Sequence, residues 1–91
     1  MFGQKVKELR EAKGLVQRQV AAELEVDTAY VSKIESDEKL ISKNHISKLS
    51  KILNVRETEL QKLWLADKIL KMFDGEDCKE EALKLVLKNL K

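Results

Sequence analysis

Two hydroxyls and one ammonium group, on Thr28, Ser32 and Lys33, are spaced to lie on the outer face of one short helix. Lysine donates to guanine O6 and N7, and serine can donate to a base or accept from it. The apolar spacing across residues 17–35 fits two short helices broken by a tight turn, and neither a strand nor one continuous helix. The small Ala21 lets the second helix approach the first closely. This pattern is typical of a helix-turn-helix, which places one helix in the major groove of DNA.

The residue pattern does not support a metal site or an enzyme active site. The chain has one cysteine and one histidine, too few for a zinc site, so no metal and no cofactor are expected. It has no glycine-rich phosphate loop and no paired nucleophile and base, so an enzyme is not expected. Cys78 is interpreted as an incidental thiol, with a redox switch near a helix N-terminus as the alternative. His45 is interpreted as a surface or loop-packing residue.

The composition indicates one small all-α domain. The 91 residues are 43% apolar and 37% charged, contain no proline and are rich in Leu, Lys, Glu and Ala, which favour helices. The net charge of +2 is small for a DNA-binding domain, so the motif rather than the charge points to nucleic acid. The sequence has no apolar run of the roughly 18 residues that a membrane span needs, and its N-terminus lacks the apolar core of a signal peptide. With its single cysteine, the chain is predicted to be cytoplasmic.

Four helices are predicted in the first 55 residues, over residues 2–13, 16–25, 28–36 and 43–53. Gly14 and Asn54 are expected to end the first and the fourth of these helices. Asp27 and Ser42 are expected as the N-caps of the third and the fourth, because their side chains can accept from free backbone N–H groups.

The last third of the chain is predicted to form a long helix over 57–73 and a final amphipathic helix with Asp77 and Glu80 as its capping box. The apolar arc of the long helix is wider than one buried face needs, which predicts cover on two sides. A stripe of this width usually marks a subunit interface, here of a two-fold dimer, and a ligand pocket is the less favoured interpretation. The predicted dimer interface comprises Leu60, Leu63, Trp64, Ile69, Phe73, Leu83, Val86, Leu87 and Leu90.

A signature runs through residues 2–55 of the chain. It consists of Leu9-Arg10, Leu15, Gln17, Val20-Ala21, Leu24, Val26, Val31-Ser32, Ile34-Glu35, Ile46, Leu49 and Ile52. In these residues the segment resembles the helix-turn-helix domain of the XRE family, which includes the Cro and repressor proteins of lambdoid phages. The resemblance implies a five-helix repressor-like bundle whose third helix reads bases. The C-terminal amphipathic helix is then an addition for dimerisation.

The resemblance also implies a role for individual residues. The positions that contact base edges are Thr28, Ala29, Ser32 and Lys33, where the Ala29 methyl can meet a thymine methyl. The positions that contact the DNA backbone are Gln17, Tyr30, Ser36, Lys39 and Lys43. Arg10 and Glu35 are expected to form a partly buried pair that positions the recognition helix.

Two residues depart from the family pattern. Glu25 stands in the turn where glycine is usual, so it must accept a left-handed conformation or a different turn. Asp27 stands where the family often has a serine or threonine facing phosphate. An acid there repels DNA unless it is turned inward as a cap.

The chain is therefore predicted to divide into a helix-turn-helix DNA-binding domain, residues 1–55, and a helical extension for dimerisation, residues 56–91. The predicted function is that of a transcriptional regulator, a repressor or controller, which binds an inverted repeat in double-stranded DNA as a homodimer. The alternative is a protein-interaction module, such as an antitoxin with weak DNA binding and an unknown protein partner. The near-neutral charge, Glu25 and Asp27 favour this alternative, and no membrane partner is expected.

Overall fold

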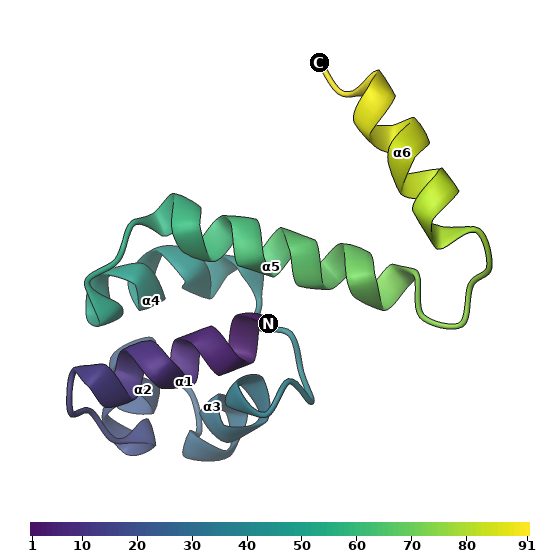
Figure 1. The fold of residues 1–91 in the computed structure, drawn as a ribbon. Coiled ribbons are helices and arrows are strands. Elements are labelled where there is room, and N and C mark those ends of the chain that lie inside the picture. The colour runs from purple at the N-terminus through teal and green to yellow at the C-terminus, as the bar shows by residue number, and fades with distance from the viewer.

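A computed structural model describes residues 1–91 as six α-helices, one short 3-10 turn and no strand (Figure 1). The helices are α1 (Phe2–Ala12), α2 (Gln17–Leu24), α3 (Thr28–Glu35), α4 (Ile46–Leu53), α5 (Glu57–Met72) and α6 (Lys79–Asn89). A 3-10 turn, η1 (Lys43–His45), leads into α4. The all-α prediction is confirmed, as is a five-helix bundle followed by one additional helix. No helix is long and apolar enough to cross a membrane.

Two helices end in left-handed residues that are not glycine. Glu25 has φ 59° and ψ 44°, so the first of the two conformations expected for this turn residue is the one adopted. The N–H groups of Glu25 and Val26 donate back to the carbonyls of Ala22 and Ala21, which closes α2 and turns the chain toward α3. Asn54 closes α4 in the same way, with φ 55°.

The start of α1 is capped by residues distant in sequence, because Met1 offers no capping side chain. The Phe2 N–H donates to Asp67 Oδ2 at 2.7 Å, and the Gly3 N–H donates to Asp37 Oδ1 at 3.0 Å. Gly3 lies so close to α3 that a Cβ there would collide with the Ile34 carbonyl oxygen. The close approach of Gly3 to Ile34 places α1 against the end of α3, and the Phe2–Asp67 hydrogen bond holds it to α5.

The core lies between α1–α4 and the first half of α5. Its buried apolar side chains are Phe2, Val6, Val20, Ala21, Leu24, Val31, Ile34, Ile41, Ile46, Leu49, Leu53 and Leu60. Leu60 is only 1% exposed, so its predicted place in a dimer interface is wrong. It fills the core because α5 packs against α1 and α4. Helix α5, which follows the predicted boundary at residue 55, packs against α1 and α4 and covers the same core.

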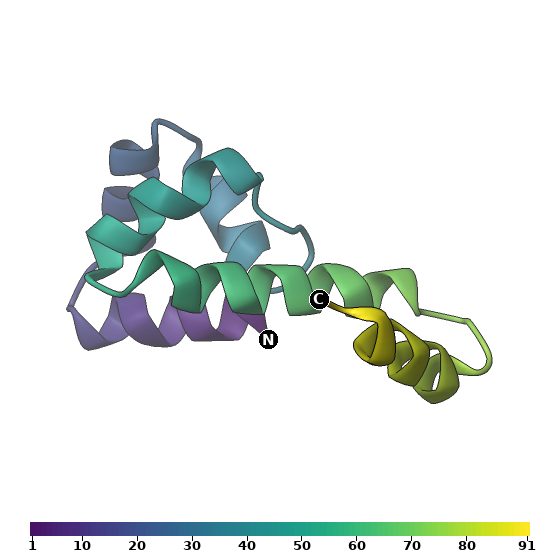
Figure 2. The same cartoon turned by 90° about the horizontal axis from the view of Figure 1, so that it is seen from above.

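The second half of α5 extends beyond the bundle, and α6 projects from its far end in both views (Figures 1 and 2). No residue of α6 is buried. The predicted capping box is absent: the helix starts after Cys78, which is left-handed and makes no side-chain cap bond, so Asp77 lies outside the cap position. The predicted N-caps Asp27 and Ser42 stand just before α3 and η1, but their side chains make no capping hydrogen bond either.

Candidate nucleic-acid interface

Helix α3 has a buried side and an exposed side. Val31, Ile34 and Glu35 anchor it in the bundle. The opposite side carries the four residues predicted to read bases, and all four are exposed: Thr28, Ala29, Ser32 and Lys33. The fold thus brings two hydroxyls, one methyl and one ammonium group onto one free helical face, which is the set of groups that direct base readout uses.

A buried ion pair holds α3 to α1. Arg10 Nε donates to Glu35 Oε2 at 2.6 Å, and Arg10 Nη2 donates to Glu35 Oε1 at 3.0 Å. Arg10 Nη1 donates to the Leu15 carbonyl oxygen at 2.6 Å, so the guanidinium also fixes the loop before α2. Arg10 is 8% exposed and Glu35 is 5% exposed. The predicted pair is therefore present, buried and bidentate, a geometry that restrains both helices.

The hydrogen-bonded Glu35 carboxylate raises the pKa of Arg10 above its ordinary value, outweighing the burial that would lower it. Arg10 is therefore charged throughout the neutral pH range. The pair thus restrains α3 through a guanidinium that remains charged.

Two residues predicted to contact the DNA backbone are held by the protein itself. Gln17 is half-buried, and its Nε2 donates to Glu35 Oε1 at 3.0 Å, which adds a third donor to the Arg10–Glu35 pair. The Tyr30 hydroxyl accepts the Ser42 N–H at 3.1 Å and so secures the loop that follows α3. That hydroxyl keeps its own hydrogen for a further acceptor.

The loop after α3 carries the remaining predicted backbone contacts, Ser36, Lys39 and Lys43, and all three are exposed. Ser36 Oγ donates to the Lys33 carbonyl at 3.2 Å, which ties the loop to the end of α3. The Lys39 ammonium lies 5.2 Å from the centre of the Tyr30 ring, where a cation is attracted to the aromatic face.

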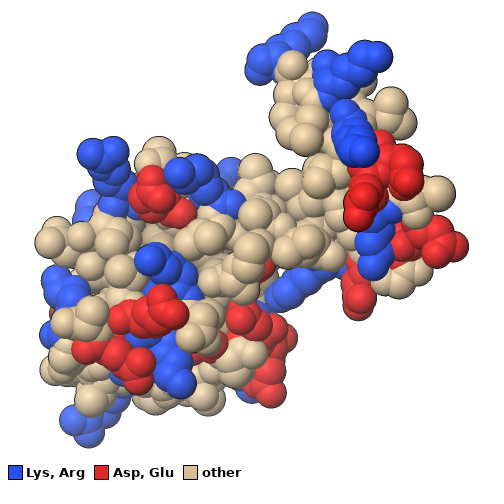
Figure 3. Space-filling model, viewed as in Figure 1, with Lys and Arg blue, Asp and Glu red and all other residues tan.

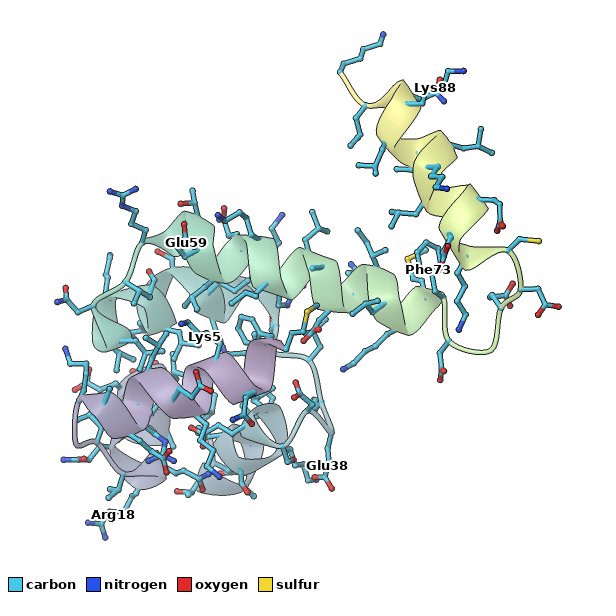
Figure 4. The ribbon with its side chains drawn as sticks, viewed as in Figure 1. Lys5, Arg18, Glu38, Glu59, Phe73 and Lys88 are labelled. Carbon is cyan, nitrogen blue, oxygen red and sulfur yellow. The ribbon has the colours of Figure 1, made fainter.

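The charge around this surface is mixed rather than uniformly basic. Acidic and basic side chains alternate over the face of the bundle drawn in Figure 3. Glu25 and Asp27 are exposed beside α3, and Asp27 is left free because it makes no capping hydrogen bond. Arg18 is a further exposed cation at the start of α2, and its side chain extends away from the bundle (Figure 4). It was not among the residues predicted from the sequence to lie in the interface. Its position next to Gln17, which was predicted to contact the DNA backbone, is the feature of the sequence that could have indicated it.

The sequence analysis also did not identify Asp37 and Asp67 as structurally important. Both accept backbone N–H groups at the start of α1 and so help to position the helices of the bundle. Nothing in the local sequence pattern indicates them, because each acts on a helix more than 30 residues away. Asp67 is only 6% exposed, which distinguishes it from the solvated acids of the surface.

A helix-turn-helix family model matches residues 6–60. The chain belongs to the XRE-type helix-turn-helix family. Comparison with solved structures finds the restriction-modification controller protein C.AhdI from Aeromonas hydrophila, at 39% sequence identity and a TM-score of 0.60. The match covers 65% of this chain and 89% of that chain. Comparison with curated proteins gives no match.

Family membership and the similarity to a controller protein identify this chain as a DNA-binding transcriptional regulator, not an enzyme. The predictions of family, fold class and broad function are therefore confirmed. Residues 6–60 contain the whole of α2 and α3, so the matched segment includes the exposed face of α3.

Proposed function

We propose that the protein binds an inverted repeat as a homodimer, with α3 of each copy in the major groove of one half-site. The observation that carries this proposal is the free face of α3, held in place by the buried Arg10–Glu35 pair. Lys33 donates to guanine, Ser32 and Thr28 bond to neighbouring base edges, and Ala29 packs against a thymine methyl.

Contacts with the DNA backbone complete this interface. Arg18 at the start of α2, together with Lys39 and Lys43 in the loop after α3, supplies positive charge on either side of the recognition helix. The free hydrogen of the Tyr30 hydroxyl donates to a phosphate, and Ser36 lies close to the same strand. Each phosphate neutralised by a cation makes the slope of log K against log salt more negative by about 0.9.

Two copies are needed because one copy offers little positive charge. Lys33 is the one cation on the exposed face of α3, and Asp27 opposes it nearby. A two-fold dimer places two recognition helices about one helical turn of DNA apart and so doubles the contacts. Of the predicted interface residues, Leu83, Val86, Leu87 and Leu90 are exposed, and Ile69 and Phe73 are half-buried. Leu63 and Trp64 are partly occupied by the core, and Trp64 Nε1 also donates to the Ile41 carbonyl.

The likeness to C.AhdI favours a controller role over the other regulatory contexts of the family. A controller that acts on its own expression binds DNA upstream of its own gene. A gel shift with that upstream DNA tests this role directly, and a restriction or methyltransferase gene beside it would support the same role.

Selection from random duplex DNA, followed by sequencing, tests the proposed function. The expected result is an enriched inverted repeat whose isolated half-site binds at least tenfold more weakly. In the same assay, Asp27→Asn should tighten binding at low salt, whereas Glu76→Gln, which removes an acid from the loop after α5, should not. If no sequence is enriched even at low salt, the protein-interaction module favoured by Glu25 and Asp27 replaces this proposal.

A further inference from the structure

A groove lies between α2 and α4, on the side of the bundle away from α6 in both views (Figures 1 and 2). This α2–α4 groove has a volume of about 690 Å³ and opens to solvent. Its walls come from the two helices and from the end of α1 with the loop that follows it. None of the exposed residues of α3 lines the groove, so it is separate from the face that is proposed to read bases.

Three lysines surround the α2–α4 groove. Lys13 comes from the end of α1, and Lys48 and Lys51 are one helical turn apart on α4. All three are exposed, and none of them forms an ion pair with an acid of the chain. Glu23 is the one acid of the lining, so three positive charges face one negative charge. The groove therefore attracts anionic groups.

The groove also has an apolar floor and a free hydrogen-bond donor. The half-buried Leu15 and Ile52 pack against the core, and the exposed Ala22 lies beside them. An apolar side chain that covers this floor would remove its area from water, which favours binding. The Gln19 Oε1 accepts the Val16 N–H at 2.8 Å, so the amide of Gln19 is held at the edge of the groove with its NH2 group unpaired.

We propose that the α2–α4 groove docks an acidic segment of another protein, in which an apolar side chain is flanked by carboxylates. The apolar side chain covers Leu15 and Ile52, while the carboxylates pair with the surrounding lysines and with the Gln19 amide. Nucleic acid is the poorer occupant, because the floor offers no partner to a phosphate and Glu23 repels it. No residue of α5 or α6 lines the groove, so docking does not depend on the proposed homodimer.

Peptide selection on the full-length protein tests this docking site, with a library of random peptides of about 12 residues as the probe. Peptides that bind the double variant Lys48→Glu, Lys51→Glu are removed first, which discards those that recognise the exposed apolar residues of α5 and α6. The expected survivors carry a leucine, isoleucine or phenylalanine next to two or more acids. Replacing that apolar residue of a selected peptide by serine should weaken binding about tenfold or more.

The double variant Lys5→Glu, Lys7→Glu is the matched control. It changes the net charge by the same amount, at two exposed lysines of α1 that lie outside the groove. A selected peptide should bind this control within about threefold of the native protein, and the Lys48→Glu, Lys51→Glu variant about tenfold or more weakly. Salt should weaken the binding to the native protein, because the lysines are exposed. Circular dichroism should show that both variants remain folded.

Each contrary result identifies a different occupant or none. If Lys48→Glu, Lys51→Glu weakens operator binding far more than the control does, these lysines contact DNA. If the same variant changes the sedimentation of the protein and the control does not, a second copy occupies the groove. If no peptide survives the selection, or if the survivors lack acids, the groove does not dock an acidic segment. All of these results would overturn the docking proposal and leave the proposed function intact, because operator binding by the native protein is measured separately.

Discussion

Arg10→Ala removes the cation that connects three parts of the bundle. In the native protein its guanidinium serves both oxygens of Glu35 and the Leu15 carbonyl. After the substitution, the Glu35 carboxylate keeps only the hydrogen bond from Gln17. It remains buried, because Glu35 is only 5% exposed. A carboxylate in such surroundings is destabilising because water cannot replace the lost partner.

The size of the effect follows from this geometry. Breaking a buried ion pair by removing one partner costs about 3–5 kcal/mol. A domain of this size has a total stability of roughly 5–14 kcal/mol, so the loss is a large share of it. At about 4–8 °C per kcal/mol, the midpoint of thermal unfolding should fall by at least about 12 °C.

Thermal unfolding followed by circular dichroism measures this loss, and a gel shift on the selected operator measures its effect on α3. Because the pKa of Arg10 is raised, its contribution is fully present below the ordinary value and is lost only in strong alkali. The difference between native and variant should therefore be the same across neutral pH. In the double variant Arg10→Met, Glu35→Leu most of the stability should return, because no buried charge is left unpaired. Unchanged thermal stability of Arg10→Ala would refute the argument.

Three further substitutions test separate parts of the structure. Lys33→Ala should weaken operator binding by about 1–3 kcal/mol and relax the base preference at one position, whereas Lys71→Ala on α5 should change neither. Leu60→Ala should cost about 2–5 kcal/mol of stability at every protein concentration, and Leu65→Ala, at an exposed site, under about 0.5 kcal/mol. A loss for Leu60→Ala that appears only on dilution would return that residue to the interface. Gly3→Ala should lower the unfolding midpoint despite alanine's higher helix propensity, because its Cβ would meet a backbone carbonyl of α3. A raised midpoint would contradict this.

Local patterns were sufficient for the helices and for the recognition surface. Apolar periodicity located α2 and α3 to within one or two residues, and the turn residues Gly14 and Asn54 located the ends of α1 and α4. The pairing of Arg10 with Glu35 followed from the family signature rather than from any local rule. The exposure of Thr28, Ala29, Ser32 and Lys33 followed from the buried positions of Val31 and Ile34, since an α-helix shows one face when the other is anchored.

Capping across the chain was not accessible to local reasoning. Asp37 and Asp67 look like ordinary surface acids in sequence, and only the fold brings them to the start of α1. The same limit explains Asp27 and Ser42, which have the right residue types at the N-cap positions but make no side-chain capping hydrogen bond. A cap needs a side-chain rotamer as well as a position, and packing selects that rotamer.

The sequence by itself determined the class of protein, the order of the helices and the face of α3 that is exposed. The tertiary structure decided how the broad apolar surface of α5 is divided. Leu60 fills the core of the single chain, while Leu70, further along the same helix, is 55% exposed. Val86 and Leu87 of α6 are 51% and 59% exposed. The periodicity of the sequence identifies the apolar face of a helix but not the surface that covers it. Whether that side chain is buried by its own chain or left for a second copy depends on where α1 and α4 end beneath α5, which is a long-range property of the fold.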